Sequence, residues 1–222
     1  PPMNRPRVTL KLATSLDGRI ATASGESRWI TSEASRAEVQ KMRAAHDAVM
    51  VGVGTVRADD PELLARTEPP SANQPARVVL DTEFSLQPSG RLFASLDRAE
   101  IIVIGADDTD GKRRVVLEGA GARTLGVGRG PAGIDAEAAL TALMGVGIGS
   151  VFAEGGGQVA ASLIAAGAVD RLEWFRAPII LGAEGRPAVG ALALARLAEA
   201  PTWRRVALRE LGPDLWESYE RA

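Results

Sequence analysis

The chain has 222 residues, 45% hydrophobic and 24% charged, which is enough to bury a sizeable core, and we expect one domain over residues 1–222. The formal net charge is -2, with 26 basic and 28 acidic residues interspersed, so nothing in the charge pattern predicts a nucleic-acid or anionic membrane partner. The absence of cysteine excludes disulfides, thiolate zinc sites and a cysteine nucleophile, and a single histidine, His46, argues against a histidine metal site or a Ser-His triad.

The sequence has no signal peptide and no apolar run of transmembrane length, so we expect a cytoplasmic protein. Pro1 and Pro2, ahead of Met3, look like an addition to the natural chain and are left out of the fold prediction. If the protein is an enzyme, its acid and base come from carboxylates, lysine or the substrate.

Apolar alternation, turn residues and helix caps predict the elements of the first third of the chain. In order, they are a half-buried strand Arg7–Ala13, a turn at Asp17-Gly18, a loop Ser24–Thr31, a helix capped by Ser32 and ending at Met42 or Arg43, and a buried strand His46–Gly54. The segment Thr55–Arg66 is predicted to be a polar loop, at the position where open α/β sheets bind ligands.

The middle of the chain continues the alternation of strands and helices, which indicates a parallel-rich sheet. The predicted elements are a loop from Thr67 to Pro75, strands Arg77–Asp81, Glu100–Gly105 and Arg123–Val127, short helices or loops at Leu92–Leu96 and Lys112–Gly119, and a helix from Asp135 to Leu143 or Met144. The C-terminal part differs: a strand Arg171–Arg176 and a loop Ile179–Gly190 precede a hairpin of Trp203–Glu210 with Asp214–Glu220.

The stretch Val151–Ile164 reads as strand, tight turn and helix, with Glu154 and three glycines at the turn. Glycine lets the backbone approach a ligand, and a helix N-terminus suits a phosphate, so a nucleotide cofactor is the first hypothesis. The spacing is not the G-x-G-x-x-G fingerprint, and glycines that only turn the chain explain the pattern as well.

Other candidate residues carry two readings each. Lys11 shares a strand face with Ala13 and is either a solvated edge residue or part of a site. Trp29 is either a core plug or a ring that stacks on a flat ligand. Arg43, one helical turn from Val39, either points inward or is a plain partner of the helix dipole, and His46 is expected to be an ordinary packed residue.

Four blocks of the sequence together resemble the signature of the reductase domain of bacterial riboflavin biosynthesis enzymes. They are KLATSLDGRIA (Lys11–Ala21), GESRWIT (Gly25–Thr31), GTVRADDP (Gly54–Pro61) and EGG (Glu154–Gly156). The resemblance covers nearly the whole chain. It implies a fold related to dihydrofolate reductase, an α/β fold of three layers with a mixed, mostly parallel central sheet, helices on both faces and a C-terminal antiparallel hairpin.

The resemblance also implies the activity, which is NADPH-dependent reduction of 5-amino-6-(5-phosphoribosylamino)uracil from ribosyl to ribityl, with no metal, by a homodimer. It assigns residues to the NADPH site, namely Ala13, Trp29, Thr55, Asp59, Gly155, Gly156 and Gly157. It assigns Ser27, Arg43, Leu63, Arg66 and Glu154 to the phosphorylated pyrimidine substrate. Lys11 and Glu154 are its candidate catalytic residues, with the proton donor left open between them.

The sequence departs from the family pattern at two positions. Leu64 stands where threonine is common, and Gly157 stands where proline often follows the Glu-Gly-Gly block, which is expected to loosen the start of the helix. The zinc deaminase that is often fused to this domain needs cysteines, so we expect the reductase part alone. Two alternatives stay open: a reductase of a dihydropterin, dihydrofolate or diaminopyrimidinone, and a nucleotide- or flavin-binding protein without turnover.

Overall fold

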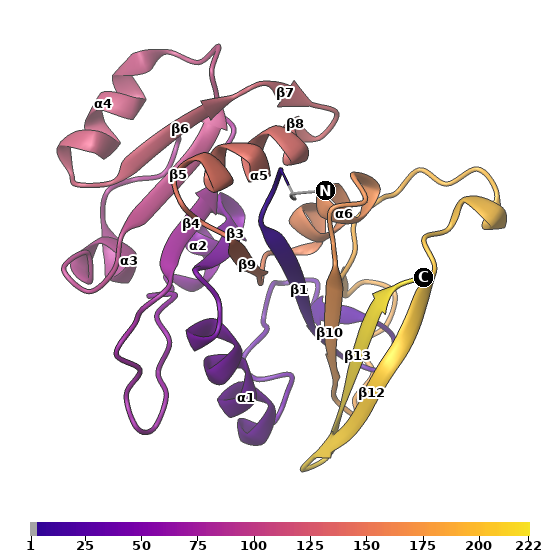
Figure 1. Ribbon diagram of the computed structural model, residues 1–222. Helices are drawn as coiled ribbons and strands as arrows, with labels where there is room; N and C mark the ends of the chain where they lie inside the picture. The colour runs from indigo at the N-terminus through magenta and orange to yellow at the C-terminus, as the bar shows by residue number, and fades with distance from the viewer. Residues whose placement is uncertain (1–3) are drawn as a thin grey trace.

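The computed structural model describes residues 4–222, so Pro1 and Pro2 lie outside the described residues (Figure 1). Its centre is a nine-stranded sheet in the order β12-β13-β10-β1-β9-β3-β4-β5-β6. The strands are β1 (Arg7–Thr14), β3 (Ala48–Gly52), β4 (Ala76–Leu80), β5 (Ile101–Ala106), β6 (Arg123–Val127), β9 (Ser150–Ala153), β10 (Arg171–Arg176), β12 (Trp203–Leu211) and β13 (Asp214–Arg221). In the order in which they lie in the sheet, the strands from β10 through β1 and β9 to β6 are mutually parallel. At one edge, β13 and β12 form the predicted antiparallel hairpin.

Helices cover both faces of this sheet (Figure 1). They are α1 (Glu33–Ala44), α2 (Val53–Asp59), α3 (Gly90–Ala94), α4 (Gly111–Gly119), α5 (Ala136–Gly145) and α6 (Gly157–Ala165), with a 3-10 turn η1 (Leu197–Glu199). Two small ribbons pair β2 (Arg19–Ala21) with β11 (Arg186–Pro187), and β7 (Arg129–Gly130) with β8 (Gly133–Ile134). Among residues 4–222, no helix combines the length and the apolar composition needed to cross a membrane.

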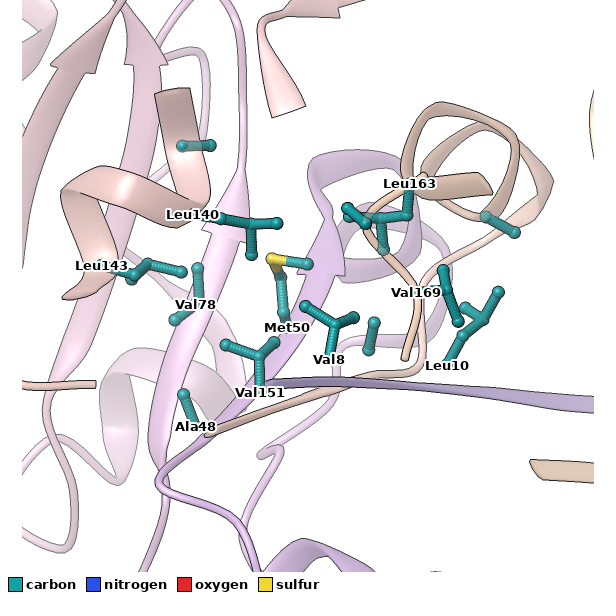
Figure 2. Close-up of a cluster of buried hydrophobic side chains, with 14 of the residues drawn as sticks. Val8, Leu10, Ala48, Met50, Val78, Leu140, Leu143, Val151, Leu163 and Val169 are labelled. Carbon is teal, nitrogen blue, oxygen red and sulfur yellow. The ribbon is translucent and has the colours of Figure 1, made fainter. Parts of the chain in front are cut away.

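Side-chain alternation along the strands assigns each face of the sheet to its own helices. In β3, Met50 belongs to the core under α5 and α6, whereas Val49 and Val51 belong to the core under α2, α3 and α4. Figure 2 shows Met50 and Val78 of the first core beside Leu140 of α5. Because these strands are buried on both faces, they appear in the sequence as continuous apolar runs.

The same alternation turns Lys11 toward α1. Leu10 and Leu12 of β1 belong to the core under α5 and α6, so the residues between and after them face the other way. Ala13 accordingly packs with Val39 of α1 in a third, smaller core. The predicted common face of Lys11 and Ala13 is therefore the face that α1 covers.

The prediction for Thr55–Arg66 was wrong in part, because α2 occupies Val53–Asp59. The sequence gives little sign of this helix. It is short, its N-cap Gly52 has no side chain to accept a hydrogen bond, and Val56 is its buried residue. Without an amphipathic repeat or a polar cap, a segment of this length resembles a loop.

Arg77 is a fully buried cation in β4 that fastens α3 and the segment after it to the sheet. Its Nη1 donates to Leu92 O at 2.8 Å and to Ser95 Oγ at 2.7 Å, and its Nη2 donates to Ser95 O at 3.1 Å and also to Ala99 O. Burial, with a further contribution from Arg98, lowers the pKa of Arg77 to about 10. Main-chain carbonyls thus take the place of a carboxylate partner.

We predict that Arg77→Met lowers the free energy of unfolding by about 3 kcal/mol, because several buried acceptors lose their donors. Denaturation in urea, followed by circular dichroism, measures the change. The control is Arg123→Met, since Arg123 is an exposed strand arginine paired with Glu100 at 3.6 Å, and we expect it to cost less than about 1 kcal/mol. Equal losses in the two variants would contradict the role given to Arg77.

Candidate active site

Two cavities, of about 700 Å³ and about 690 Å³, meet at the carboxyl edge of the parallel strands. The first lies on the side of α5 and α6 and is lined by Met50, Leu140 and Leu163. The second lies on the side of α1 and is lined by Lys11, Val39 and Arg43. The residues that border both cavities are Ile20, Ser27, Thr55, Asp59 and Gly156. Ligands bound in the two cavities would therefore touch at this boundary.

The first cavity combines a helix N-terminus with an apolar wall. Helix α6 begins at Gly157 after the N-cap Gly156, and both glycines line the cavity, so free N–H groups and the positive end of the helix dipole lie at its wall. Leu80, Ile134 and Ala139 supply apolar lining. A helix N-terminus is suited to bind phosphate, and its position beside an apolar surface fits a dinucleotide.

The start of α6 at Gly157, expected from the sequence to be loose, packs closely against the segment after β11. A Cβ atom at this position would lie 2.6 Å from Pro187 O, because the segment after β11 packs directly on the glycine. The Gly190 N–H also donates to Gly157 O at 2.8 Å. A residue without a side chain lets the two segments meet and holds the helix start in place.

Three charged side chains form the centre of the second cavity. Arg43 binds the Glu154 carboxylate through two donors, Nε to Oε1 at 2.5 Å and Nη2 to Oε2 at 3.0 Å. Lys11 Nζ lies 3.9 Å from Glu154 Oε2. The side chains of Glu154, Arg43 and Lys11 are 7%, 13% and 18% exposed, so their charges act on one another with little screening.

This arrangement shifts the pKa values of Lys11 and Glu154 away from their ordinary ranges. Burial lowers the pKa of Lys11, and Arg43 lowers it further, against the opposing attraction of Glu154. Burial by itself would raise the pKa of Glu154, but the charge and hydrogen bonds of Arg43, with the charge of Lys11, hold it below its usual range. Glu154 is therefore an anion at neutral pH, and Lys11 is the more acidic ammonium that can release a proton.

The hydrogen-bond donors of the Arg43 guanidinium are largely occupied by groups of the protein itself. Besides its two bonds to Glu154, its Nη1 donates to Leu64 O at 3.1 Å. Leu63, next to Leu64, is buried and holds a left-handed backbone with φ of 59°, an uncommon conformation for a residue with a branched side chain. Arg66 and Arg91, whose side chains are about half exposed at this cavity, lie 3.8 Å and 3.4 Å from the same Glu62 oxygen.

The loop Ser27–Thr31 borders the second cavity with an exposed aromatic ring. Trp29 is 66% exposed, and the Arg36 guanidinium lies 4.4 Å from its ring centroid while donating to Thr31 O at 2.6 Å. Arg28 Nη2 donates to Asp59 O at 2.6 Å, which ties this loop to the end of α2. The loop is thus anchored, with the Arg28 guanidinium also 5.7 Å from the centroid of the exposed indole ring.

All the residues predicted for the site line one or both cavities. Ala13, Trp29 and Gly155, predicted for the cofactor, line the second cavity, and Gly157 lines the first. The sequence reasoning missed the lining arginines Arg28, Arg36, Arg91 and Arg186, since single arginines between elements carry no periodic signal. His46 is hydrogen bonded to Met42 O and Thr9 Oγ1, which agrees with its prediction as a packed residue.

A family model described as "RibD C-terminal domain" matches residues 6–216. The chain belongs to this family. The riboflavin biosynthesis protein RibD of Bacillus amyloliquefaciens is 36% identical over 214 residues, which cover 95% of this chain and 56% of that protein. The chain therefore spans little more than half the length of the RibD relatives that it matches.

Solved structures agree with this RibD-domain assignment. RibD of Acinetobacter baumannii superposes with a TM-score of 0.86 at 28% identity, over 99% of this chain and 59% of that one. A Thermotoga maritima structure titled as a diaminohydroxyphosphoribosylaminopyrimidine deaminase/5-amino-6-(5-phosphoribosylamino)uracil reductase gives 0.79 at 27% identity, over 98% and 57%. Dihydrofolate reductase of Enterococcus faecalis gives 0.51 at 13% identity, over 97% and 96%, which confirms the dihydrofolate-reductase-like fold.

We predict that Arg43 and Glu154 of this RibD domain are strongly coupled in stability. Arg43→Met or Glu154→Gln alone strands a buried charge and costs about 3 kcal/mol, whereas the double variant loses clearly less than the sum. Urea denaturation of the four proteins gives the coupling energy. The control cycle uses Lys41 and Glu38, an exposed pair on the same helix at 2.9 Å, for which we expect less than about 1 kcal/mol. Equal coupling in both cycles would contradict the prediction.

Proposed function

We propose that the chain is an NADPH-dependent reductase of riboflavin biosynthesis, which converts the ribosyl group of 5-amino-6-(5-phosphoribosylamino)uracil to ribityl. The observation that carries the proposal is the trio of Lys11, Glu154 and Arg43 beside the boundary of two ligand-sized cavities. Membership of the RibD family and the activity named for the Thermotoga maritima relative support the same reaction. We further propose one domain over residues 1–222, acting as a cytoplasmic homodimer on a small molecule and not on nucleic acid.

The family implies a nicotinamide cofactor, and we assign NADPH to the first cavity. When bound, the nicotinamide supplies the hydride. Gly156 and Gly157 would hold the phosphates at the start of α6, supported by the helix dipole. Thr55 and Asp59, which border both cavities, would flank the passage between them. The nicotinamide end would extend through it to Ala13, Trp29 and Gly155, which line the second cavity.

Lys11 acts as the proton donor in this proposal. The ribosylamine ring opens to an imine, the imine carbon accepts the hydride, the C=N double bond becomes a single bond, and the nitrogen takes one proton. Lys11 suits this transfer because burial has made its ammonium more acidic than that of an ordinary lysine. Glu154 is held as a carboxylate by Arg43, so it accepts hydrogen bonds from substrate N–H or O–H groups.

The phosphate end of the substrate would lie between Ser27 and Arg66, beside the backbone of Leu63. Because Arg43 is already bound to Glu154 and Leu64 O, its main role in this proposal is to position the carboxylate. Arg91, exposed at the same cavity and close to Arg66 across Glu62, would be a second cation for the phosphate. A guanidinium pair is well suited to the oxygens of a phosphate.

The test of the proposed function is NADPH oxidation, followed by absorbance, with three substrates in parallel: the phosphoribosylaminouracil, its diaminopyrimidinone precursor and dihydrofolate. We expect turnover with the uracil compound, and Lys11→Met to reduce kcat by about 100-fold or more, since a positioned acid contributes that much. Arg66→Ala raises KM for the phosphorylated substrate. Faster turnover of dihydrofolate, or of the precursor, would reassign the substrate, and NADPH binding without any turnover would refute the reductase.

We predict that kcat/KM falls at alkaline pH because Lys11 loses its proton. The apparent pKa of this alkaline limb of the pH profile lies below the ordinary lysine pKa of about 10.4. The rate falls as pH rises because the protonated form is required and burial lowers its pKa. Glu154→Gln removes an attraction that retains the proton and moves the limb to lower pH, whereas Arg43→Met removes a repulsion and moves it to higher pH. Rate profiles between neutral and alkaline pH test the two signs. A limb that moves in neither variant would exclude Lys11 as the titrating group.

A further inference from the structure

His46, the single histidine of the chain, lies just after α1 and contacts three elements of the fold. Its Nδ1 lies 2.7 Å from Met42 O of α1, and Nδ1 is the donor because a carbonyl oxygen only accepts. Its Nε2 lies 2.9 Å from Thr9 Oγ1 of β1. Its ring packs against that of Phe152 in β9, with the two centroids 5.2 Å apart. One side chain therefore joins the end of a helix to two strands of the sheet.

The strand contacts of this histidine lie next to the charged side chains of the second cavity. In the register of β1 and β9, Thr9 is opposite Phe152. Lys11 and Glu154 lie two residues further along the same two strands, which places them about 7 Å away on the same face of the sheet. The imidazole therefore covers the pair of residues that directly precedes Lys11 and Glu154 on this face.

On the helix side, His46 holds the last turn of α1, which carries Arg43. Besides the side-chain bond to Met42 O, the main-chain N–H of His46 donates to Arg43 O at 3.3 Å. The side chain of Arg43 leaves this turn and donates to Glu154. A displacement of the last turn from β1 would therefore move Arg43 away from both Glu154 and Lys11.

We propose that His46 is a positioning residue for the reductase reaction, which ties the last turn of α1 to β1 and so keeps Arg43 at Glu154 and close to Lys11. The inference rests on the proposed function for its effect on turnover. Arginine has a long and flexible side chain, so the geometry of its ion pair depends on where its backbone is held. Imidazole is a rigid ring bonded at both nitrogens, which fixes the spacing between helix and strand.

A looser helix end is expected to raise the pKa of Lys11. Burial lowers this pKa, and the charge of Arg43 lowers it further. If the last turn of α1 moves outward, water reaches Lys11 and Arg43 retreats, and both changes favour the ammonium form. The attraction of Glu154, which opposes these two effects, is retained because β1 and β9 keep their register. All of the changes thus move the titration of Lys11 in one direction, toward higher pH.

Nuclear magnetic resonance of ¹³Cε-labelled lysine measures this titration in the intact chain, whose three lysines are Lys11, Lys41 and Lys112. The signal that Lys11→Met removes is that of Lys11. Thr9→Val replaces the hydroxyl by a methyl group of similar size, and we expect it to raise the midpoint of the Lys11 titration by about half a pH unit, as the loss of one hydrogen bond allows. An unmoved midpoint would overturn the role given to His46.

Two substitutions of His46 separate its two side-chain bonds. An Asn amide can still donate to Met42 O but is too short to reach Thr9, so we expect His46→Asn to shift the Lys11 titration as Thr9→Val does. A Gln amide reaches the position of Nε2, so His46→Gln is expected to retain most of the original titration. The double variant His46→Asn/Thr9→Val shifts Lys11 no further than either single variant, because both remove the same bond. Equal shifts with Asn and Gln, or additive shifts in the double variant, would contradict the proposal.

Thr124→Val is the matched control for Thr9→Val. Thr124 is also a buried strand threonine, 9% exposed against 5% for Thr9, and its Oγ1 accepts from Arg114 Nε at 3.2 Å. It lies on β6, the edge strand at the far side of the sheet from the C-terminal hairpin. We expect this control to leave the Lys11 titration in place. A shift as large as that of Thr9→Val would show that general loosening moves Lys11, and the tie through His46 would be refuted.

The reductase assay separates this inference from the proposed function. We expect Thr9→Val and His46→Asn to lower kcat by about tenfold, less than the hundredfold that a displacement of about 1 Å can cost. KM for NADPH stays unchanged, because the cofactor is assigned to the first cavity. The lysine titration needs no substrate, so the expected shifts support the tie even if the unaltered protein reduces no pyrimidine, in which case the proposed function alone fails. Turnover of the pyrimidine with an unmoved titration in both variants refutes the tie alone.

Discussion

The buried carboxylate of Glu154 is the group around which the site is organised. Burying one charge is costly unless partners of opposite charge approach closely, and here Arg43 and Lys11 supply them from two other elements. The register of the sheet brings Lys11 close to Glu154. Strands β1 and β9 are parallel neighbours with Leu10 opposite Ala153, so the next residues, Lys11 and Glu154, lie side by side. The order of strands thus determines the chemistry at this edge.

Arg43 reaches Glu154 because α1 is held at its other end by the C-terminal hairpin. The side chain of Asp214, at the start of β13, accepts from Ser32 N–H at 2.7 Å and from Ser35 Oγ at 2.6 Å. Ser32, the N-cap of α1, also donates to Leu211 O at 3.1 Å. A buried carboxylate at a helix N-terminus is favoured by the dipole and by free N–H groups. The antiparallel edge of the sheet therefore helps to position Arg43 at the candidate site, although it lies at the other end of α1.

Much of this organisation could be predicted from the sequence, and what escaped has a physical reason. Strands buried on both faces are recognisable by continuous apolar runs, and α1 by the Ser32 cap. The family resemblance indicated the residues that line the cavities. No local pattern indicates, however, that the inward face of α1 brings Arg43 to a carboxylate 111 residues away. Nor does one reveal that two arginines converge on Glu83, since they come from α4 and β7.

The two ends of the site share one design that the centre lacks. Glu62 lies between Arg66 and Arg91 at the second cavity, as Glu83 lies between Arg113 and Arg129 at the first. The carboxylates of Glu62 and Glu83 are more exposed than that of Glu154, so separating them from Arg66, Arg91 and Arg129 costs less. Arg113 is held by the main-chain oxygen of Glu83 instead. Glu154 is buried and bound through two hydrogen bonds, so no ligand displaces it from Arg43 at comparable cost. Under the proposed function, exchangeable ion pairs suit the places where a phosphate would bind and leave, whereas a fixed one suits the centre, where it preserves the lowered pKa of Lys11.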